Sequence, residues 1–275
     1  MNASSVAAQA GAGAIQFSSV DGRTVLTRKA ATSPLRILNP RNAGTAAWAY
    51  LATFGGGLVG GDEVRIDIAV APGAHALVAT QASTKVYRSE KGAAQRLRAD
   101  VGRDSLLALL PDPVTCFAGA RYTQEQRICL EASANLVFVD WLTAGRIASG
   151  ERWQFHGYRS RTFLWRADRL IWHDALTLDP GDGDVPDRMG RFNCLAVAVA
   201  TGPAFETTAA RLVGAIGSAP ATRRADMLLS AAPLDDEGVV LRVAGSSTEA
   251  VAETLRQHLN IVPSLLGDDP WSRKW

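Results

Sequence analysis

Residues 65–79 read RIDIAVAPGAHALVA, and this stretch predicts how the chain folds. Its first half alternates apolar side chains with charged or small ones, which is the period of a strand with one face in a core and one toward solvent. Ala71–Ala74 contains Pro-Gly and predicts a turn. Leu77–Ala79 is apolar again, so a second strand is expected directly after the turn.

The same unit recurs along the chain. Arg65, Arg96 and Arg127 are spaced by 31 residues, and each opens an alternating segment that a turn joins to a second apolar strand. A fourth, altered copy is expected over 162–172. Repeats of 20–50 residues are typical of units that stack to complete one another's core, although an antiparallel meander also produces such spacings by coincidence. The prediction is a mainly β, elongated fold of stacked or meandering strands, β-solenoid-like.

Helical signals are confined to the last third of the chain, so a small α-helical part is expected near the C-terminus. Apolar residues there recur at helical spacing, and turn and capping residues divide the segment. The expected elements are a helix over 205–216, a short helix over 225–229, a strand over 239–243, and a helix capped by Ser246 with Glu249 and ended by Pro263.

Composition excludes several classes of protein. The 275 residues include 29 Lys and Arg against 27 Asp and Glu, a net charge of +2, so no nucleic-acid-binding stripe is expected. No apolar run approaches the ~20 residues that a membrane-spanning helix needs. Three cysteines at wide spacing predict free thiols and a cytoplasmic location. Residues 1–14 lack the features of a signal peptide and predict a flexible tail, with a single domain over 15–275.

The Gly-rich stretch Gly55–Asp62 is the first candidate site. A phosphate-binding loop requires Lys-Ser or Lys-Thr after its last glycine and then a helix, whereas here Asp62 and Glu63 precede a predicted strand. Two hypotheses remain. The glycines form a sharp corner between strands, or their backbone lies close to a partner with Asp62 at the lip of a site.

Two further segments are candidate sites. Ser83–Arg88 contains two hydroxyls, a Lys, a Tyr and an Arg between apolar strands; it is either a solvated loop or a functional group of side chains. Asp140 follows an apolar strand and precedes Trp141. A carboxylate in that position is either buried and paired, with Arg146 as the candidate partner, or lines a cavity.

No tight metal site is expected. The four histidines form no HxH, HxxxH or HExxH pattern, and the cysteines form no CxxC. A weak, transient path for a divalent ion could still use carboxylates. The candidates are Asp62, Glu63, Asp140, Glu151 and Asp174.

Six segments in order resemble the urease accessory protein UreD family, which is called UreH in some organisms. The resemblance runs from about residue 15 to the C-terminus, and several ordered blocks are more specific than any single glycine motif. The segments are GGGLVGGD at 55–62, ATQASTKVYR at 79–88, PDP at 111–113, WLTAGR at 141–146, GERW at 150–153 and GRFNCLA at 190–196.

The resemblance implies a β-rich fold and a non-catalytic chaperone of nickel enzyme maturation. It implies binding to apo-urease and to UreF, which recruits the GTPase UreG, and transient Ni²⁺ with no tightly bound cofactor. It also implies an internal tunnel for nickel. The residues that it places in or around that tunnel, besides the carboxylates, are Gly55, Gly56, Gly57, Gly60, Gly61, Ser83, Thr84, Lys85 and Arg146.

Two alternatives come from other classes of protein. One is a hydrolase on a β-repeat frame that uses Asp140, His173 and Asp174, although the nucleophile elbow GxSxG is absent from the sequence. The other is a plain protein-binding module whose glycines only form turns.

Overall fold

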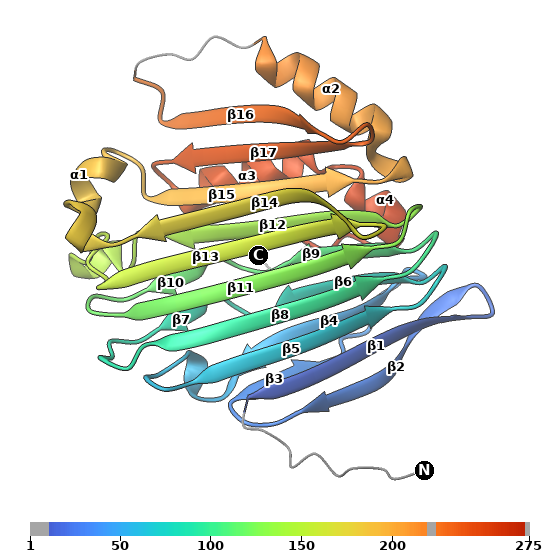
Figure 1. The fold of residues 1–275 in the computed structure, drawn as a ribbon, viewed down its shortest axis with the longest axis horizontal. Helices are drawn as coiled ribbons and strands as arrows, with labels where there is room; N and C mark the ends of the chain where they lie inside the picture. Colours follow the sequence, from blue (N-terminus) through green and yellow to red (C-terminus); the bar gives the residue numbers. More distant parts are fainter. Residues whose placement is uncertain (1–10, 219–223, 273–275) are drawn as a thin grey trace.

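The computed structural model describes residues 11–218 and 224–272. About half of these residues lie in strands, which form two sheets stacked face to face with apolar side chains between them (Figure 1). Both sheets mix parallel and antiparallel pairs, and the longer helices follow in the last third of the chain. The predicted mainly β class with a small helical part is therefore confirmed, whereas a β-solenoid as such stays a prediction.

The first sheet has seven strands within the described ranges. Its inner neighbours pair in parallel, and antiparallel hairpins close it at both edges. The order is β14 (Arg169–Leu178), β13 (Gly157–Arg166), β11 (Arg121–Leu130), β8 (Ala93–Val101), β5 (Glu63–Val70), β1 (Ala12–Val20) and β2 (Arg23–Ala31).

The second sheet has eight strands in a continuous order over the described residues. The order is β16 (Met227–Leu234), β17 (Gly238–Gly245), β15 (Cys194–Thr201), β12 (Asn135–Thr143), β9 (Leu106–Leu110), β6 (His75–Thr80), β4 (Ala47–Thr53) and β3 (Leu35–Leu38). Two short strands extend it at one end, because β10 (Val114–Cys116) pairs with both β12 and β7 (Thr84–Val86).

The predicted repeat corresponds to the chain crossing between the sheets. Arg65 lies opposite Arg96, which preserves the predicted spacing of 31 residues. The next unit is shorter by two residues, because Arg96 lies opposite Glu125 and Arg127 lies opposite Arg98. The predicted alignment of Arg127 is therefore wrong by two residues. The fourth copy is also wrong, because β14 turns back beside β13 in the same sheet instead of crossing over.

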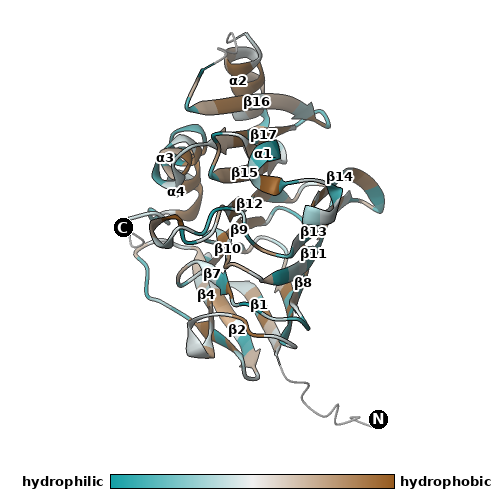
Figure 2. Ribbon diagram, turned by 90° about the vertical axis from the view of Figure 1, so that its left-hand side faces the viewer, coloured by the Kyte–Doolittle hydropathy of each residue, from teal (hydrophilic) through white to brown (hydrophobic). Residues whose placement is uncertain are grey.

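Two hydrophobic cores follow from the alternation of the strands. Ile66 and Ile68 of β5 are each 2% exposed and pack between the sheets, while Asp67 between them faces outward. A second core lies on the outer side of the second sheet, where helices cover it (Figure 2). Each fully buried aliphatic or aromatic side chain contributes about 1.5–3 kcal/mol, so the two cores hold the layers together.

The helices cover the second sheet only, and no helix in the described part of the chain covers the outer face of the first sheet (Figures 1 and 2). None of the described helices is long and apolar enough to cross a membrane. The helices are α1 (Val185–Met189), α2 (Glu206–Gly217), α3 (Thr248–His258) and α4 (Val262–Leu266), with single 3₁₀ turns η1 (Phe54–Gly56), η2 (Ile147–Ser149), η3 (Pro180–Asp182) and η4 (Pro203–Phe205).

Three details of the helical part differ from the sequence prediction. The segment predicted as a helix over 225–229 is not helical, because Met227–Leu229 belong to strand β16 and pair with β17. Ser247 rather than Ser246 caps α3, with its hydroxyl accepting from the Ala250 N–H at 3.3 Å. Pro263 lies in the first turn of α4, where a missing N–H costs nothing, instead of ending the preceding helix. The predicted helix over 205–216 and strand over 239–243 are confirmed.

The N-terminal boundary also moves. Residues 1–10 of the predicted tail lie outside the described residues, but Ala12–Ala14 belong to strand β1 and pair with both β2 and β5. The predicted tail is therefore wrong for Ala12–Ala14. The three cysteines are free thiols, as predicted.

Candidate functional site

The Gly-rich corner is shaped by close contact with another part of the same chain. Gly55 and Gly56 adopt positive φ in η1, and Leu58 then pairs with Val86 of β7. A Cβ at Gly57 would lie 2.7 Å from the Lys85 carbonyl oxygen, closer than real Cβ atoms come. The close approach of these glycines is to β7 of the same chain, as a corner between strands requires, and approach to a partner stays a prediction.

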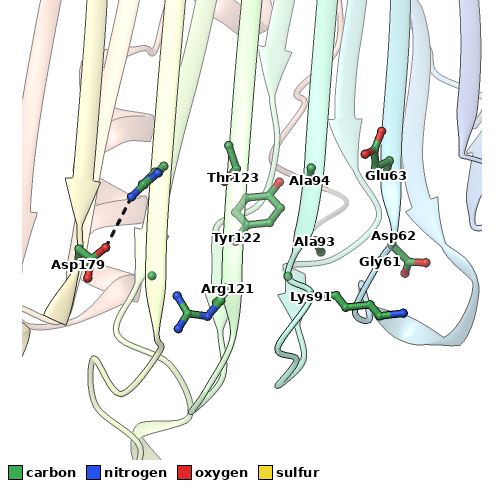
Figure 3. Close-up of a pocket in the computed structure, with 13 residues that line it drawn as sticks. Gly61, Asp62, Glu63, Lys91, Ala93, Ala94, Arg121, Tyr122, Thr123 and Asp179 are labelled. Carbon is green, nitrogen blue, oxygen red and sulfur yellow. Dashed lines mark ion pairs between the residues drawn. The ribbon is translucent and has the colours of Figure 1, made fainter. Parts of the chain in front are cut away.

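Asp62 and Glu63 lie where β5, an interior strand of the first sheet, begins. Asp62 closes the corner, since its Oδ2 accepts from the Val59 N–H at 2.8 Å. Glu63 is exposed and pairs with Arg65 at 3.0 Å on the outer face. Figure 3 shows both carboxylates along one side of a shallow surface pocket, with Arg121 nearer its middle. This pocket is open to solvent and separate from the space between the sheets.

Asp140 lies between the two sheets and is held by neutral partners. Its Oδ1 and Oδ2 each accept from Gln124 Nε2 at 2.8 Å, and Ser160 Oγ donates to Oδ2 at 2.9 Å. No cation in the described part of the chain pairs with it. Burial raises the pKa of Asp140, and the hydrogen bonds from Gln124 and Ser160 offset part of that increase.

The predicted partner of Asp140 is wrong. Arg146 instead forms a bidentate pair with Glu151 and lies over the ring of Phe117, 4.3 Å from its centroid. The Arg146 pair and the Ala118 N–H together lower the pKa of Glu151. The structural ion pair with Arg146, which was one of the two alternatives for Asp140, is therefore formed by Glu151.

A small cavity with both polar and apolar lining residues lies beside Asp140, between the sheets. Its volume is about 30 Å³, which exceeds the ~10–15 Å³ that a single water molecule needs. A second carboxylate, Asp112, lines the same cavity and accepts from Thr80 Oγ1 at 3.0 Å. The other polar side chains that line it are Thr80, Thr84, Gln95, Gln124 and Gln126.

Sequence reasoning missed Asp112 and the three glutamines. The alternation of β11 contains the signal for two of them, because Gln124 and Gln126 occupy inward positions between the exposed Thr123, Glu125 and Arg127. Polar residues at core positions of a strand indicate a polar interior. Asp112 follows β9 in a Pro-Asp-Pro segment, and no local pattern shows that it turns inward.

The predicted carboxylates do not converge on one point. Of the five, Asp140 alone lines the cavity. Asp174 pairs with Arg242 and so joins β14 to β17 across the two sheets. No group of three or more His, Cys, Asp or Glu side chains within residues 11–218 and 224–272 is arranged to hold a metal ion.

The predicted polar group at 83–88 divides between two environments. Thr84 lines the cavity, whereas Lys85 is exposed at the start of β7. Ser83 is half-buried just before that strand and does not line the cavity. The side chains of Ser83, Thr84 and Lys85 are neighbours in the sequence but do not line one common site.

The hydrolase constellation is not assembled. His173 stacks on Phe163 on the outer face of the first sheet, with ring centroids 4.5 Å apart, while Asp140 lies on the inner side. A general base and its orienting carboxylate must lie within hydrogen-bond reach of each other. Asp140 and His173 lie on opposite sides of the sheet and cannot form that pair.

Part of the cavity lining consists of oxygen-bearing side chains. Carboxylate, amide and hydroxyl oxygens are ligands that divalent ions accept, whereas imidazole and thiolate are absent from the described lining. The other lining residues are apolar, among them Leu51, Leu97 and Leu109.

Comparison with known proteins places the chain in one family. Residues 9–275 match the family model described as UreD urease accessory protein. A urease accessory protein UreD of Sorangium cellulosum is 50% identical over 98% of this chain and 86% of its own length. Urease accessory protein D of Arabidopsis thaliana is 32% identical over 94% of this chain and 99% of its own length. The chain belongs to the UreD family of urease accessory proteins.

Proposed function

We propose that this chain is a non-catalytic scaffold through which Ni²⁺ passes on its way to the active site of urease. In this proposal the chain binds apo-urease and UreF, and UreF brings the GTPase UreG. The observation that carries the proposal is the cavity between the sheets, with Asp140 at its wall and no cation of residues 11–218 and 224–272 paired to that carboxylate.

The electrostatics of Asp140 support passage rather than storage. A buried carboxylate is costly to ionise without a cation, and an arriving divalent ion offsets that cost. Gln124 and Ser160 already donate to the carboxylate, so they compete with the ion and keep its binding weak. The second carboxylate, Asp112, gives the ion a further oxygen ligand in the same cavity.

The scaffold role is tested by reconstitution. Purified apo-urease, UreF, UreG and this chain are mixed with GTP and NiSO₄, and the nickel in re-isolated urease is measured by mass spectrometry. We expect urease to acquire nickel and a complex containing all four components to appear in size-exclusion chromatography. Equal nickel loading of urease without this chain would refute the scaffold role. Failure of this chain to bind apo-urease and UreF would also refute it and would favour the alternative of a plain module for other protein partners.

A further inference from the structure

The outer face of the first sheet carries a group of arginine and aromatic side chains on adjacent strands. Arg127 of β11, Phe163 of β13 and His173 of β14 lie opposite one another in the ladder, and Arg161 and Trp165 lie two residues to either side of Phe163. These five residues are called the arginine–aromatic patch. No helix among the described residues covers it (Figure 1).

The patch lies on a basic face of the first sheet, and its arginines are paired with carboxylates less than the other arginines of that face. The outward positions of β8, β11 and β13 hold six arginines against two carboxylates, Asp100 and Glu125, whereas the whole chain has a net charge of only +2. Most of these arginines already have partners, such as Arg98 with Asp100 at 3.0 Å and Arg159 with Asp179 at 3.7 Å.

Arg127 and Arg161 differ from their neighbours. Neither forms an ion pair within the described residues, even though Glu125 lies opposite Arg161 in the ladder. Two exposed guanidinium groups on neighbouring strands therefore have their donors available to an outside carboxylate, which a guanidinium binds in bidentate fashion.

The aromatic side chains hold the patch in place before any partner arrives. The Arg127 guanidinium lies over the Trp165 ring, 5.3 Å from its centroid, and the rings of Phe163 and His173 stack with planes 9° apart. Trp165 Nε1 is buried and has no hydrogen-bond partner in the described part of the chain. Side chains that are already ordered lose less entropy on binding, and Arg and Trp are enriched among the residues that dominate binding energy.

A surface hollow adjoins the patch. It has a volume of about 550 Å³ and lies along the row Ala69, Asp100, Cys129 and Trp165, where Ala69 and Cys129 are small. Three carboxylates, Asp100, Glu131 and Asp168, also line the hollow, so the acidic groups of a partner are expected at the arginines and not in the hollow itself. Its wall includes Arg127, so a partner bound to that arginine can place a neighbouring apolar side chain in the hollow.

We propose that the arginine–aromatic patch docks an acidic segment of a partner protein. Carboxylates of that segment pair with Arg127 and Arg161, and an apolar side chain beside them fills the hollow over Cys129. Nucleic acid fits the face less well, because two arginines without an ion pair are far fewer than the roughly 6–10 phosphate contacts of a typical site. The identity of the partner rests on the proposed function, which supplies apo-urease and UreF as the proteins to test.

The test measures binding of the full-length chain to purified apo-urease and, separately, to purified UreF. The double variant Arg127→Glu/Arg161→Glu is compared with Arg28→Glu/Arg211→Glu, which makes the same change of charge at exposed positions away from the patch. We expect the patch variant to raise Kd for one partner at least tenfold and to weaken its salt dependence, with the control unchanged. Arg127→Lys/Arg161→Lys, which keeps the charge but loses the bidentate fork, should fall between them.

A photo-crosslinking residue at Phe163 supplies a second readout that does not depend on the folding of the arginine variants. We expect a crosslink to a segment of the same partner that is rich in Asp and Glu. If the wild-type chain binds its partners and the patch variant binds them equally well, the patch is not a docking site, while the scaffold role stands. If the wild-type chain binds neither partner, both proposals fail.

Discussion

Asp140 is the residue for which the alternatives predicted from the sequence can be compared most directly with the structure. Its position after an apolar strand predicts a carboxylate that is either paired or facing a cavity, and the structure selects the cavity. Arg146 is out of reach because it pairs with Glu151 beyond the end of β12. Sequence order alone cannot decide this, because the partners of Asp140 come from β11 and β13, 16 and 20 residues away along the chain.

The raised pKa of Asp140 predicts how Asp140→Asn changes stability with pH. A raised folded-state pKa means that ionisation costs stability, so the wild-type chain loses stability as pH rises from about 4, the unfolded value, through the folded value. Asp140→Asn removes this cost. We expect the variant to be at least as stable as the wild type at pH 7.5, with the difference shrinking toward pH 4. Urea unfolding at several pH values between 4 and 7.5 measures the free energy of unfolding of both chains. The expectation is contradicted if the stability of the variant relative to the wild type is lower at pH 7.5 than at pH 4.

At the scale of elements, alternation identified the strands well and the connections poorly. The pattern of β5 and β6 predicts both strands and their turn, because an inward face needs apolar residues at every second position. It cannot reveal that β14 returns to the same sheet, because a hairpin and a crossover share the same local pattern. The segment over 225–229 was mistaken for a helix for a related reason, since a short apolar run suits either element until its pairing partner is known.

The contact between Gly57 and Lys85 predicts a large effect of a single methyl group. We expect Gly57→Ala to destabilise the chain by about 1–3 kcal/mol, because the new Cβ would press on the Lys85 carbonyl oxygen of β7. The matched control is Gly214→Ala in α2, where a Cβ meets nothing within 4 Å and alanine should stabilise the helix by up to about 1 kcal/mol. Thermal unfolding of both variants measures the contrast, and equal stability of the two would show that the corner is not tightly packed.

The cap of α3 gives a second prediction at this scale. Ser247→Ala should cost about 1 kcal/mol, because the Ala250 N–H loses its acceptor. Ser246→Ala, one residue earlier, removes no capping contact and should change the free energy of unfolding by less than about 0.5 kcal/mol. Chemical denaturation of the two variants decides between the observed cap and the one expected from sequence.

For the whole molecule, the sequence predicted the class of fold better than the position of the cavity. The Gly-rich corner looked like a functional centre, but its glycines serve the packing of β7, and Asp62 closes a turn at the surface. The polar residues that line the cavity come from several strands, and these strands belong to both sheets. Their convergence depends on which strands pair and in which register, and the local sequence pattern does not give either.

The most direct test of the nickel path is the nickel bound per urease active site after maturation with Asp140→Asn. This variant keeps the size of the side chain and removes its charge, and Asp236→Ala, an exposed carboxylate outside the cavity, is the control. With complex assembly verified by size-exclusion chromatography, we expect nickel loading at limiting Ni²⁺ to fall at least about fivefold for Asp140→Asn and to stay at the wild-type level for the control. Wild-type nickel loading by Asp140→Asn in a fully assembled complex would contradict passage of the ion beside Asp140.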